Sequence, residues 1–348
     1  MIYNQVKQIS ETHLLPIISG LYGLNGYENY SIKPIDEHEG GRNIVYVCES
    51  ESGSAKIIRI AFLNDRSRED FLAETEYVRY LHEHGGSVSN VVDSRSGNMV
   101  EEVIHDNHSF FVCVFEKAKG KQLAESGYQY REGVPISEYY YNCGKTLGKL
   151  HQLSKRYTPV HKRSSFFSRF NAEYIDKLIP DSPSSLTTLK TKLYRLLEEL
   201  DGLSKSSETY GMIHFDYSDG NYNIDFETGQ ITVYDFDNSC FGWYLYDLAN
   251  LWTHGVGWIQ HESDIDKRKA FMDDYWGTIV EGYRSETDIS DGALLQLPLL
   301  IQAVLMENIV DKFEVARNND EEVEYEDEEL LYLIKCLTDD IPYKGFFN

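Results

Sequence analysis

Hydrophobic residues in the first third of the chain gather in short runs rich in Ile, Val and Tyr, and turn-forming residues separate these runs. Three of them, Tyr30–Ile35, Ile44–Glu49 and Ala55–Phe62, follow one another closely. Asn98–Ile104 and Ser109–Phe115 share this character, and the second is almost wholly apolar, which is typical of a central strand. The pattern predicts an antiparallel sheet in this part of the chain.

Apolar residues also recur at helical spacing. They do so between Ser67 and Glu83, where Gly85-Gly86 then supplies a stop signal. Past Gly120 this spacing dominates and predicts helices over Ile136–Tyr157, Ser184–Leu203, Phe271–Tyr283, Ala293–Val315 and Glu328–Leu337. One island, Gly211–Phe241, departs from the helical pattern because short β-prone runs there flank a turn at Glu227–Gln230.

The order of these elements predicts an α+β protein with two lobes. We expect a strand-rich N-terminal lobe over residues 1–115, a connector over residues 116–120 and a larger, mainly helical lobe over residues 121–348. Sites for small molecules form preferentially in a cleft between lobes, so the connector marks the region in which to look for one.

Composition narrows the classes of partner. The 348 residues carry 33 Lys and Arg against 57 Asp and Glu, a formal net charge of −24, which repels nucleic acid and favours a cationic small ligand, although acidity alone also serves solubility. No apolar stretch approaches the length of a membrane span, and the first residues do not resemble a signal peptide. The five cysteines are scattered and form no CxxC pair, so we expect reduced thiols, no zinc site and a cytoplasmic protein.

The chemistry-bearing motif is His214-Phe-Asp216-Tyr-Ser-Asp-Gly-Asn221, followed by Asp235-Phe-Asp237. Phosphoryl transfer needs a carboxylate that orients and deprotonates the acceptor hydroxyl, and hard oxygen ligands for Mg²⁺. Asp216 suits the first role, and Asn221 and Asp235 suit the second if a loop and a strand end aim all three at one point. Taken singly, the same residues are also compatible with Asx-turns and exposed strand ends. His214 is expected to fix the loop by hydrogen bonds.

At these residues the sequence resembles the aminoglycoside phosphotransferase and choline kinase-like family. Members carry His-Gly-Asp-Leu-His-x-x-Asn and then Ile-Asp-Phe/Trp-Asp or Glu, so this chain departs at Phe215 and Ser218, neither of which is a catalytic carboxylate or a metal ligand. Tyr246-Asp247-Leu-Ala249 resembles the downstream family segment that braces the catalytic region. The resemblance implies a bilobal fold related to the protein kinases, in which the N-terminal lobe binds the nucleotide.

The resemblance also implies a nucleotide site. Gly40 and Gly41 stand in its glycine turn, where backbone N–H groups approach phosphates, although two glycines between strands are more often an ordinary hairpin. Arg59 is the expected phosphate-binding cation, with Lys56 in reserve on the opposite strand face, and Glu74 is its expected ion-pair partner. In the connector, we expect the Glu116 carbonyl and the Ala118 N–H to bind the purine.

Together these observations predict a Mg²⁺-dependent kinase that uses ATP or GTP and phosphorylates a small, amine-bearing hydroxyl compound, such as an aminoglycoside, a choline-like amino alcohol or homoserine. Acidic and aromatic side chains of the C-terminal lobe are candidates to bind the amine: Asp237, Asp247, Trp243, Trp252 and Trp258. A catalytically silent binding module, a protein Ser/Thr kinase and, less favoured, a metal-dependent hydrolase are the alternatives. The sequence leaves the acceptor, the nucleotide and the oligomeric state open.

Overall fold

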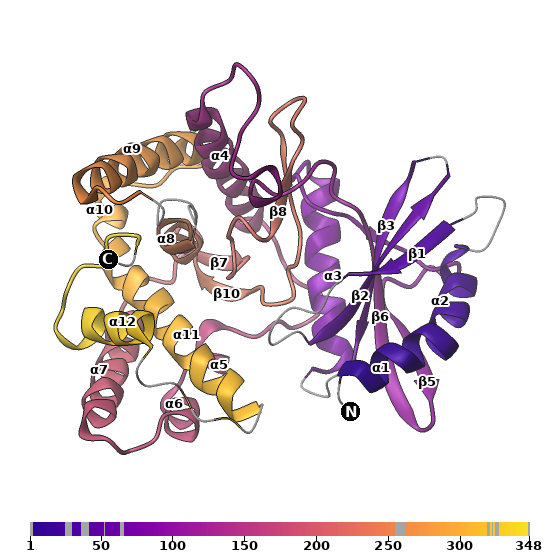
Figure 1. Cartoon of the computed structure of the whole chain (residues 1–348), viewed down its shortest axis with the longest axis horizontal. Coiled ribbons are helices and arrows are strands. Elements are labelled where there is room, and N and C mark those ends of the chain that lie inside the picture. The colour runs from indigo at the N-terminus through magenta and orange to yellow at the C-terminus, as the bar shows by residue number, and fades with distance from the viewer. Residues whose placement is uncertain are drawn as a thin grey trace. The chain divides into compact units, whose positions relative to one another are not determined.

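The structure is a computed structural model that describes residues 3–24, 30–35, 42–51, 53–62, 66–254, 262–318, 321, 323 and 327–346. The chain folds as two compact units (Figure 1). Unit 1 comprises Met1–Lys119 together with Tyr157–Arg163 and Thr232–Asp237. Unit 2 comprises Gly120–Arg156, Ser164–Ile231 and Asn238–Asn348. Unit 1 therefore takes in two segments that the sequence assigned to the C-terminal lobe.

Unit 1 is built on an antiparallel sheet in the order β1-β2-β3-β6-β4, with β5 also paired to β6. The nearly apolar β6 has neighbours on both sides, as its sequence predicts. The elements of this unit are α1 (Tyr3–Ile9), a π-helical turn (Ser10–Leu14), α2 (Leu15–Tyr22), β1 (Tyr30–Pro34), β2 (Asn43–Ser50), β3 (Ala55–Ala61), α3 (Arg68–Glu83), β4 (Val91–Val92), β5 (Glu101–His105) and β6 (His108–Glu116).

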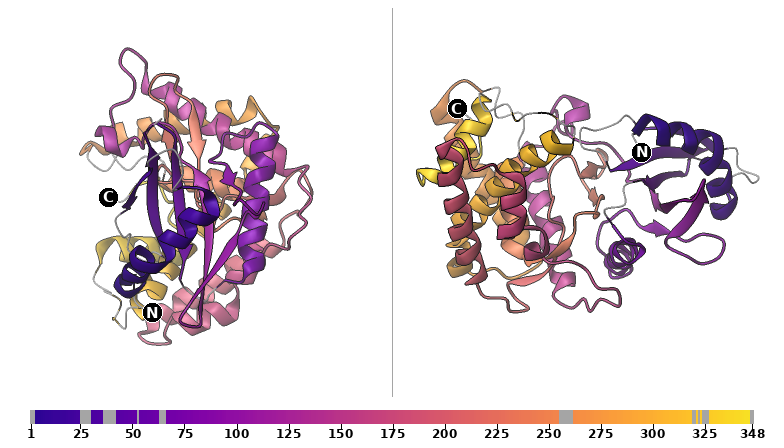
Figure 2. Two further views of the ribbon diagram at one scale, coloured as in Figure 1. Left: turned by 90° about the vertical axis from the view of Figure 1, so that its right-hand side faces the viewer. Right: turned by 90° about the horizontal axis from the view of Figure 1, so that it is seen from below.

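The two faces of this sheet carry different helices, α1 and α2 on one face and α3 on the other, as the views in Figure 2 show. Ile58 and Ile60 of β3 pack with the helices α1 and α2, whereas Ala61 packs with Phe71 of α3. Because side chains alternate along a strand, Arg59 belongs to the α3 face of the sheet. The alternation of side chains along β3 thus decides which face of the sheet Arg59 points to.

Helix α3 begins at a capping box in which Ser67 and Asp70 each bond the other's backbone N–H group. Two consecutive glycines follow the helix, and Gly85 has a left-handed φ of +84° that ends it. The expected helix over Ser67–Glu83 is confirmed. The residues at its two ends carry the signals that start and stop it.

Unit 2 is mainly helical. Its elements are a 3₁₀ turn (Ala124–Ser126), α4 (Ile136–Ser154), α5 (Phe166–Arg169), α6 (Ala172–Leu178), α7 (Ser184–Asp201), β7 (Tyr210–Ile213), β8 (Tyr222–Ile224), β10 (Cys240–Trp243), α8 (Tyr244–His254), α9 (Ile265–Arg284), α10 (Asp291–Leu294), α11 (Leu297–Asn318) and α12 (Glu328–Thr338). Strand β7 pairs with β10, and β8 pairs with β9 (Ile231–Val233), in which the boundary between the units falls. Strands concentrated in unit 1 and helices in unit 2 confirm the α+β class.

Helices α4 and α9 approach each other closely through glycines. A Cβ atom added at Gly144 would lie 1.9 Å from the Ile279 carbonyl oxygen, and one added at Gly282 would lie 2.0 Å from the Tyr141 carbonyl oxygen. Any side chain at these two positions would force the helices apart. In the part of the chain that the structure describes, no helix is long and apolar enough to cross a membrane.

Candidate active site

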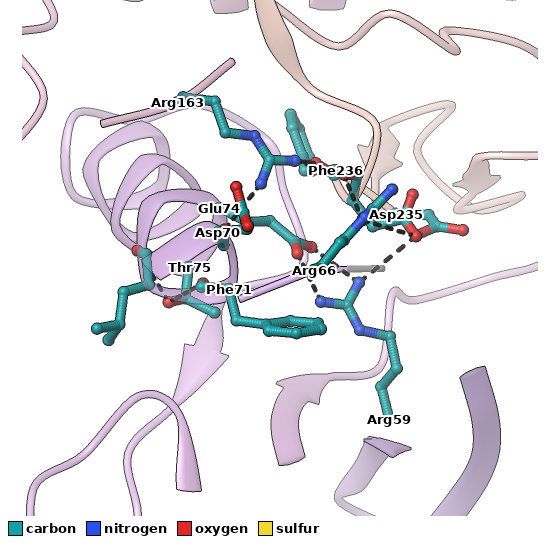
Figure 3. Close-up of polar contacts among 11 residues, drawn as sticks. Arg59, Arg66, Asp70, Phe71, Glu74, Thr75, Arg163, Asp235 and Phe236 are labelled. Carbon is teal, nitrogen blue, oxygen red and sulfur yellow. Dashed lines mark hydrogen bonds and ion pairs between the residues drawn. The ribbon is translucent and has the colours of Figure 1, made fainter. Parts of the chain in front are cut away.

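Unit 1 holds a buried ion pair between its sheet and α3. Arg59 donates from Nη1 to Glu74 Oε1 over 2.8 Å and from Nη2 to Glu74 Oε2 over 2.6 Å (Figure 3). Only 6% of Arg59 and 1% of Glu74 is exposed. Such a two-bond pair between a planar guanidinium and a carboxylate fixes the direction as well as the position of both groups. The other strand cation, Lys56, lies instead over the ring of Tyr30, with Nζ 5.5 Å from the ring centroid.

Electrostatics keep Arg59 charged although it is buried. Burial is the largest influence and opposes the charge, but Glu74 above all, and also Asp237, raise the pKa of the guanidinium well above its usual value. Burial likewise raises the pKa of the Cys113 thiol to about 12, so this cysteine stays protonated beside Arg59. The site thus presents a permanent positive charge, which suits phosphate binding.

The Asp235–Asp237 segment also belongs to unit 1. Asp235 Oδ1 lies 3.7 Å from Arg59 Nη1, and its carboxylate is 51% exposed. Its backbone has a left-handed φ of +62°, which is uncommon for a residue with a side chain. The structure therefore brings together three of the expected site residues, namely Arg59, Glu74 and Asp235 (Figure 3).

Asp237 is surrounded by arginines rather than open to a ligand. Arg66 Nη1 lies 3.2 Å from Asp237 Oδ2 and donates to the Asp237 carbonyl oxygen over 2.6 Å. Burial is the largest influence on this carboxyl and favours its protonation, but its neighbours lower the pKa below the usual value: Arg66, Arg59, Arg42 and Arg163. Asp237 is therefore a charged structural anchor, and the expectation that it binds the acceptor amine is corrected.

The catalytic loop candidate lies in unit 2 and contains a strained residue. Phe215 stands where the resembled family has glycine, and it has a left-handed φ of +76°. Its ring is 5% exposed and stacks on Tyr246 at 4.9 Å and on Phe170 at 5.9 Å, in each case with 17° between the ring planes. Aromatic packing on both sides thus holds a backbone conformation that glycine adopts without cost.

Asp247 braces the same loop from α8. Its Oδ2 accepts from the His214 backbone N–H over 2.8 Å, and its Oδ1 accepts from the Phe215 backbone N–H over 2.8 Å. His151 Nε2 lies 3.1 Å from Asp247 Oδ2, and His151 Nδ1 lies 2.9 Å from Tyr283 Oη. Asp247 is fully buried, so its expected part in amine binding is corrected, whereas its bracing role matches what the resemblance implied. Burial lowers the pKa of His151.

The side chain of Asn221 is bonded to the backbone of Asp216 within the loop. Asn221 Nδ2 donates to the Asp216 backbone carbonyl oxygen over 2.8 Å, and the Asn221 N–H donates to the Ser218 carbonyl oxygen over 3.0 Å. The first bond uses the amide nitrogen of Asn221, so it orients the side chain with its oxygen, the atom that hard cations prefer, on the other side. Both side chains are partly exposed.

The oxygen atoms of Asp235 and Asn221 suit a hard cation whose remaining ligands come from substrate phosphates and water. An exposed carboxylate at Asp235 and an oriented amide oxygen at Asn221 are oxygen ligands of the kind that Mg²⁺ uses beside substrate phosphates and water. Among the described residues, no group of three or more His, Cys, Asp and Glu side chains is arranged to hold a metal ion. Asp235 lies in unit 1 and Asn221 in unit 2, so their convergence stays a prediction.

The remaining expected residues fall at the connector and in the glycine turn. Gly40 and Gly41 lie outside the described residues. Glu116 ends β6 and donates its N–H to the Asn90 carbonyl oxygen over 2.8 Å, while Ala118 is buried. Gly120, which begins unit 2, has φ +85°, and an added Cβ would lie 1.8 Å from the Ile224 carbonyl oxygen, so only glycine fits there.

Sequence reasoning missed Arg66 and Arg163, which bond to Asp237, and one carboxylate near Asp216. Burial raises the pKa of Glu307, on α11, to about 8, and Asp216 contributes to that rise. No local pattern marks these residues, because Arg163 reaches Phe236 across 73 residues of chain. Trp258, an expected amine-binding residue, lies outside the described residues, and Trp243 is buried.

Comparison with known proteins identifies a family, a relative and a solved structure that the chain resembles. The model of the family described as "Phosphotransferase enzyme family" matches residues 32–279. Amicoumacin kinase of Bacillus subtilis (strain 168) is 30% identical over 260 residues, which cover 74% of this chain and 73% of that protein. The solved structure of the amicoumacin kinase hAmiN in complex with AMP-PNP, Ca²⁺ and Ami has a TM-score of 0.82 at 25% identity and covers 99% of this chain and 98% of that one.

A second solved structure, of a microcompartment-associated aminopropanol kinase, has a TM-score of 0.67 at 20% identity and covers 97% of this chain and 99% of that one. This likeness shows a shared fold. With the first structure, it confirms the kinase-like fold that the sequence resemblance implied.

Proposed function

The chain belongs to the phosphotransferase enzyme family, and on that premise we propose that it transfers the γ-phosphate of ATP or GTP to a hydroxyl group of a small, amine-bearing molecule, with Mg²⁺ as the cofactor. The observation that carries the proposal is the meeting of Arg59, Glu74 and Asp235 in unit 1. It puts a permanent cation for phosphates within 3.7 Å of a carboxylate suited to a metal ion.

Each residue then has a defined task. The Asp216 carboxylate accepts a hydrogen bond from the acceptor hydroxyl and takes its proton as the new O–P bond forms. Asn221 and Asp235 hold Mg²⁺, which neutralises charge on the phosphate oxygens when it is bound. As the bond between the β- and γ-phosphates breaks, its electron pair leaves with the nucleoside diphosphate, whose charge Arg59 stabilises. Glu74 keeps Arg59 aimed at that position.

The nucleotide is held by backbone groups in the same proposal. The N–H groups of Gly40 and Gly41 contact phosphate oxygens, because residues without a Cβ allow a close approach. The Glu116 carbonyl oxygen and the Ala118 N–H bind the purine edge at the end of β6.

The charge balance on α11 supports an amine on the acceptor. Glu307, Asp311 and Glu314 follow one another at helical spacing, and Arg169 Nη2 lies 3.5 Å from Asp311 Oδ1 and 3.1 Å from Glu314 Oε2. Arg169 thus pairs with two carboxylates, and Glu307, which burial keeps largely protonated at neutral pH, lies near the acidic Asp216. An ammonium group on the acceptor would be attracted to these acidic groups close to the base and would favour the ionised form of Glu307.

The test is a transfer assay on the purified protein. Mg²⁺ and ATP or GTP are combined with a panel of acceptors, and the phosphorylated product is measured by mass. Amicoumacin and aminopropanol come first, because kinases named for these compounds match the chain, and aminoglycosides, choline and homoserine follow. We expect transfer to at least one acceptor and a loss of about 100-fold or more in kcat for Asp216→Asn.

Two results would redirect the assignment. Nucleotide binding without transfer to any acceptor, with Asp216→Asn matching the wild type, identifies a catalytically silent binding module. Transfer to a protein serine or threonine, with none to the small acceptors, identifies a protein kinase of the same family. Activity that persists when Mg²⁺ is removed with a chelator contradicts the proposed cofactor.

A further inference from the structure

A buried arginine outside the motifs links the two halves of the phosphate site in unit 1. Arg163 is 8% exposed and lies in the segment Tyr157–Arg163, which packs with unit 1 although its neighbours in sequence belong to unit 2. Arg163 Nη1 donates to the Asp70 carbonyl oxygen over 2.7 Å, in the first turn of α3. Arg163 Nη2 donates to the carbonyl oxygen of Phe236 over 3.4 Å (Figure 3) and also to that of Asp237.

The same segment is tied to α3 at a second point. Glu76 accepts from the backbone N–H of Val160 over 2.7 Å and from that of His161 over 2.9 Å, and His161 Nδ1 lies 2.8 Å from Glu76 Oε2. Burial is the largest influence on the Glu76 carboxyl and raises its pKa, but these hydrogen bonds outweigh it and lower the pKa below the usual value. These bonds therefore fix the segment on α3 at Val160 and His161, just before Arg163 in the sequence.

We propose that Arg163 is a positioning residue that sets the place of Asp235 relative to the Arg59–Glu74 pair. The inference rests on the proposed function, in which Asp235 holds the metal ion. Glu74 lies one helical turn beyond Asp70, and Asp235 lies two residues before Asp237. One planar guanidinium therefore holds both the helix that aims Arg59 and the segment that presents the metal ligand.

The conformation of Asp235 explains why such a clamp is needed. Its side chain is 51% exposed and its φ is +62°, so packing of the side chain itself does not fix a conformation that residues with a Cβ adopt rarely. A strained residue persists where the surrounding structure holds it in place. Here the hydrogen bonds to the carbonyl oxygens of Phe236 and Asp237 do so, and Arg66 adds a bond to the second of these.

The experiment compares Arg163→Met, Arg163→Lys and a matched control, Arg79→Met. Arg79 also donates to a backbone carbonyl, that of Val91 over 2.9 Å, and pairs with Asp93, so its loss tests general destabilisation of α3 away from Asp235. The readout is the affinity for AMP-PNP with and without Mg²⁺, measured by calorimetry on the full chain, together with thermal unfolding. Neither measurement requires that the acceptor be known.

We expect Arg163→Met to bind AMP-PNP normally without Mg²⁺ and to need about tenfold more Mg²⁺ for the metal-dependent gain in affinity, as is typical when a group supporting a metal ligand is removed. Arg163→Lys recovers part of the loss, because an ammonium group still reaches one carbonyl oxygen. Arg79→Met unfolds earlier but keeps the wild-type Mg²⁺ dependence. With an active acceptor, kcat falls in Arg163→Met while the KM for the acceptor stays unchanged.

Two outcomes separate this inference from the function it rests on. If Arg163→Met changes thermal stability alone, as Arg79→Met does, Arg163 is structural and the inference is overturned while the proposed function stands. If Asp235→Asn leaves the Mg²⁺ dependence of AMP-PNP binding unchanged, Asp235 is not a metal ligand, and both the proposed metal site and the role of Arg163 are wrong.

Discussion

Replacing Phe215 by glycine, the residue of the resembled family at this position, is predicted to destabilise the protein. The backbone at φ +76° costs a residue with a Cβ about 1–2 kcal/mol, and glycine relieves that cost. The Phe215 ring, however, is buried between Phe170 and Tyr246, and truncating a buried phenylalanine costs about 3–5 kcal/mol. Packing outweighs strain, so we expect Phe215→Gly to lose about 2–4 kcal/mol of unfolding free energy.

A comparison with alanine isolates the backbone contribution. Phe215→Ala leaves nearly the same cavity but keeps the strain, whereas glycine loses about 0.5–1 kcal/mol more chain entropy on folding. Phe215→Gly should therefore be more stable than Phe215→Ala by about 0.5–1 kcal/mol. Phe170 is the matched control, because it is also buried in this stack but has φ −92°. There the order reverses, and Phe170→Gly is less stable than Phe170→Ala.

The assay is equilibrium urea unfolding followed by tryptophan fluorescence. The four tryptophans of the chain lie between Trp243 and Trp276, within the range of unit 2, so the signal reports on the unit that contains Phe215. The slope of free energy against urea must match among the variants for the differences to be compared. If glycine and alanine rank in the same order at both positions, the left-handed backbone at Phe215 does not carry the strain assigned to it.

Three further predictions follow from the same contacts. Asp247→Asn replaces one acceptor oxygen by a donor that faces a backbone N–H, so we expect a loss of about 1–3 kcal/mol in urea unfolding and a lower kcat; an unchanged kcat would show that the loop needs no brace. Glu74→Gln removes the charged partner that accepts both hydrogen bonds of the buried Arg59 and leaves the half-exposed Asp235 at 3.7 Å, so we expect a loss of about 3–5 kcal/mol in unfolding and a raised KM for the nucleotide in initial-rate assays; a variant as stable as the wild type would show that the pair does not stabilise the fold. Because burial raises the pKa of Glu307 to about 8, its folded form binds more protons than its unfolded form between the two pKa values. Wild-type stability therefore falls relative to Glu307→Gln as pH rises from the unfolded pKa through about 8, and unfolding midpoints at acidic and alkaline pH check this; a constant difference would refute it. With an amine-bearing acceptor, Glu307→Gln should also raise KM more than it lowers kcat.

The helices that sequence analysis found and missed differ in how they are buried. Helix α3 buries one face and starts at Ser67, so its apolar spacing and its cap are visible in sequence. Helix α8 is buried on almost every side from Tyr244 to Leu251, and this includes the polar residues Asp247 and Asn250, so polar positions in its sequence do not mark an exposed face. The short helices α5 and α6 hold too few turns to show one.

The residues of the candidate site also divide into those that the sequence predicts and those that only the structure reveals. Asp216 and Asn221 lie on one short loop, and their spacing with Asp235 identified the chemistry before any fold was known. Because side chains alternate along a strand, Lys56 and Arg59 point to opposite faces of the sheet. The structure shows that Arg59 is on the face that carries α3. These conclusions needed only interactions among residues close in sequence, whose periods and caps are fixed by backbone geometry.

Contacts between distant residues were decided by the tertiary structure alone. Arg163 and Asp237 are 74 residues apart, and no local preference brings them together. Phe215 adopts a glycine-like conformation because the rings of Tyr246 and Phe170 enclose it, and the pKa of Glu307 rises because the packing around α11 buries it near Asp216. Burial, charge and strain depend on what packs around a residue, whereas turns, caps and alternation depend on its neighbours along the chain, and only the latter are present in the sequence itself.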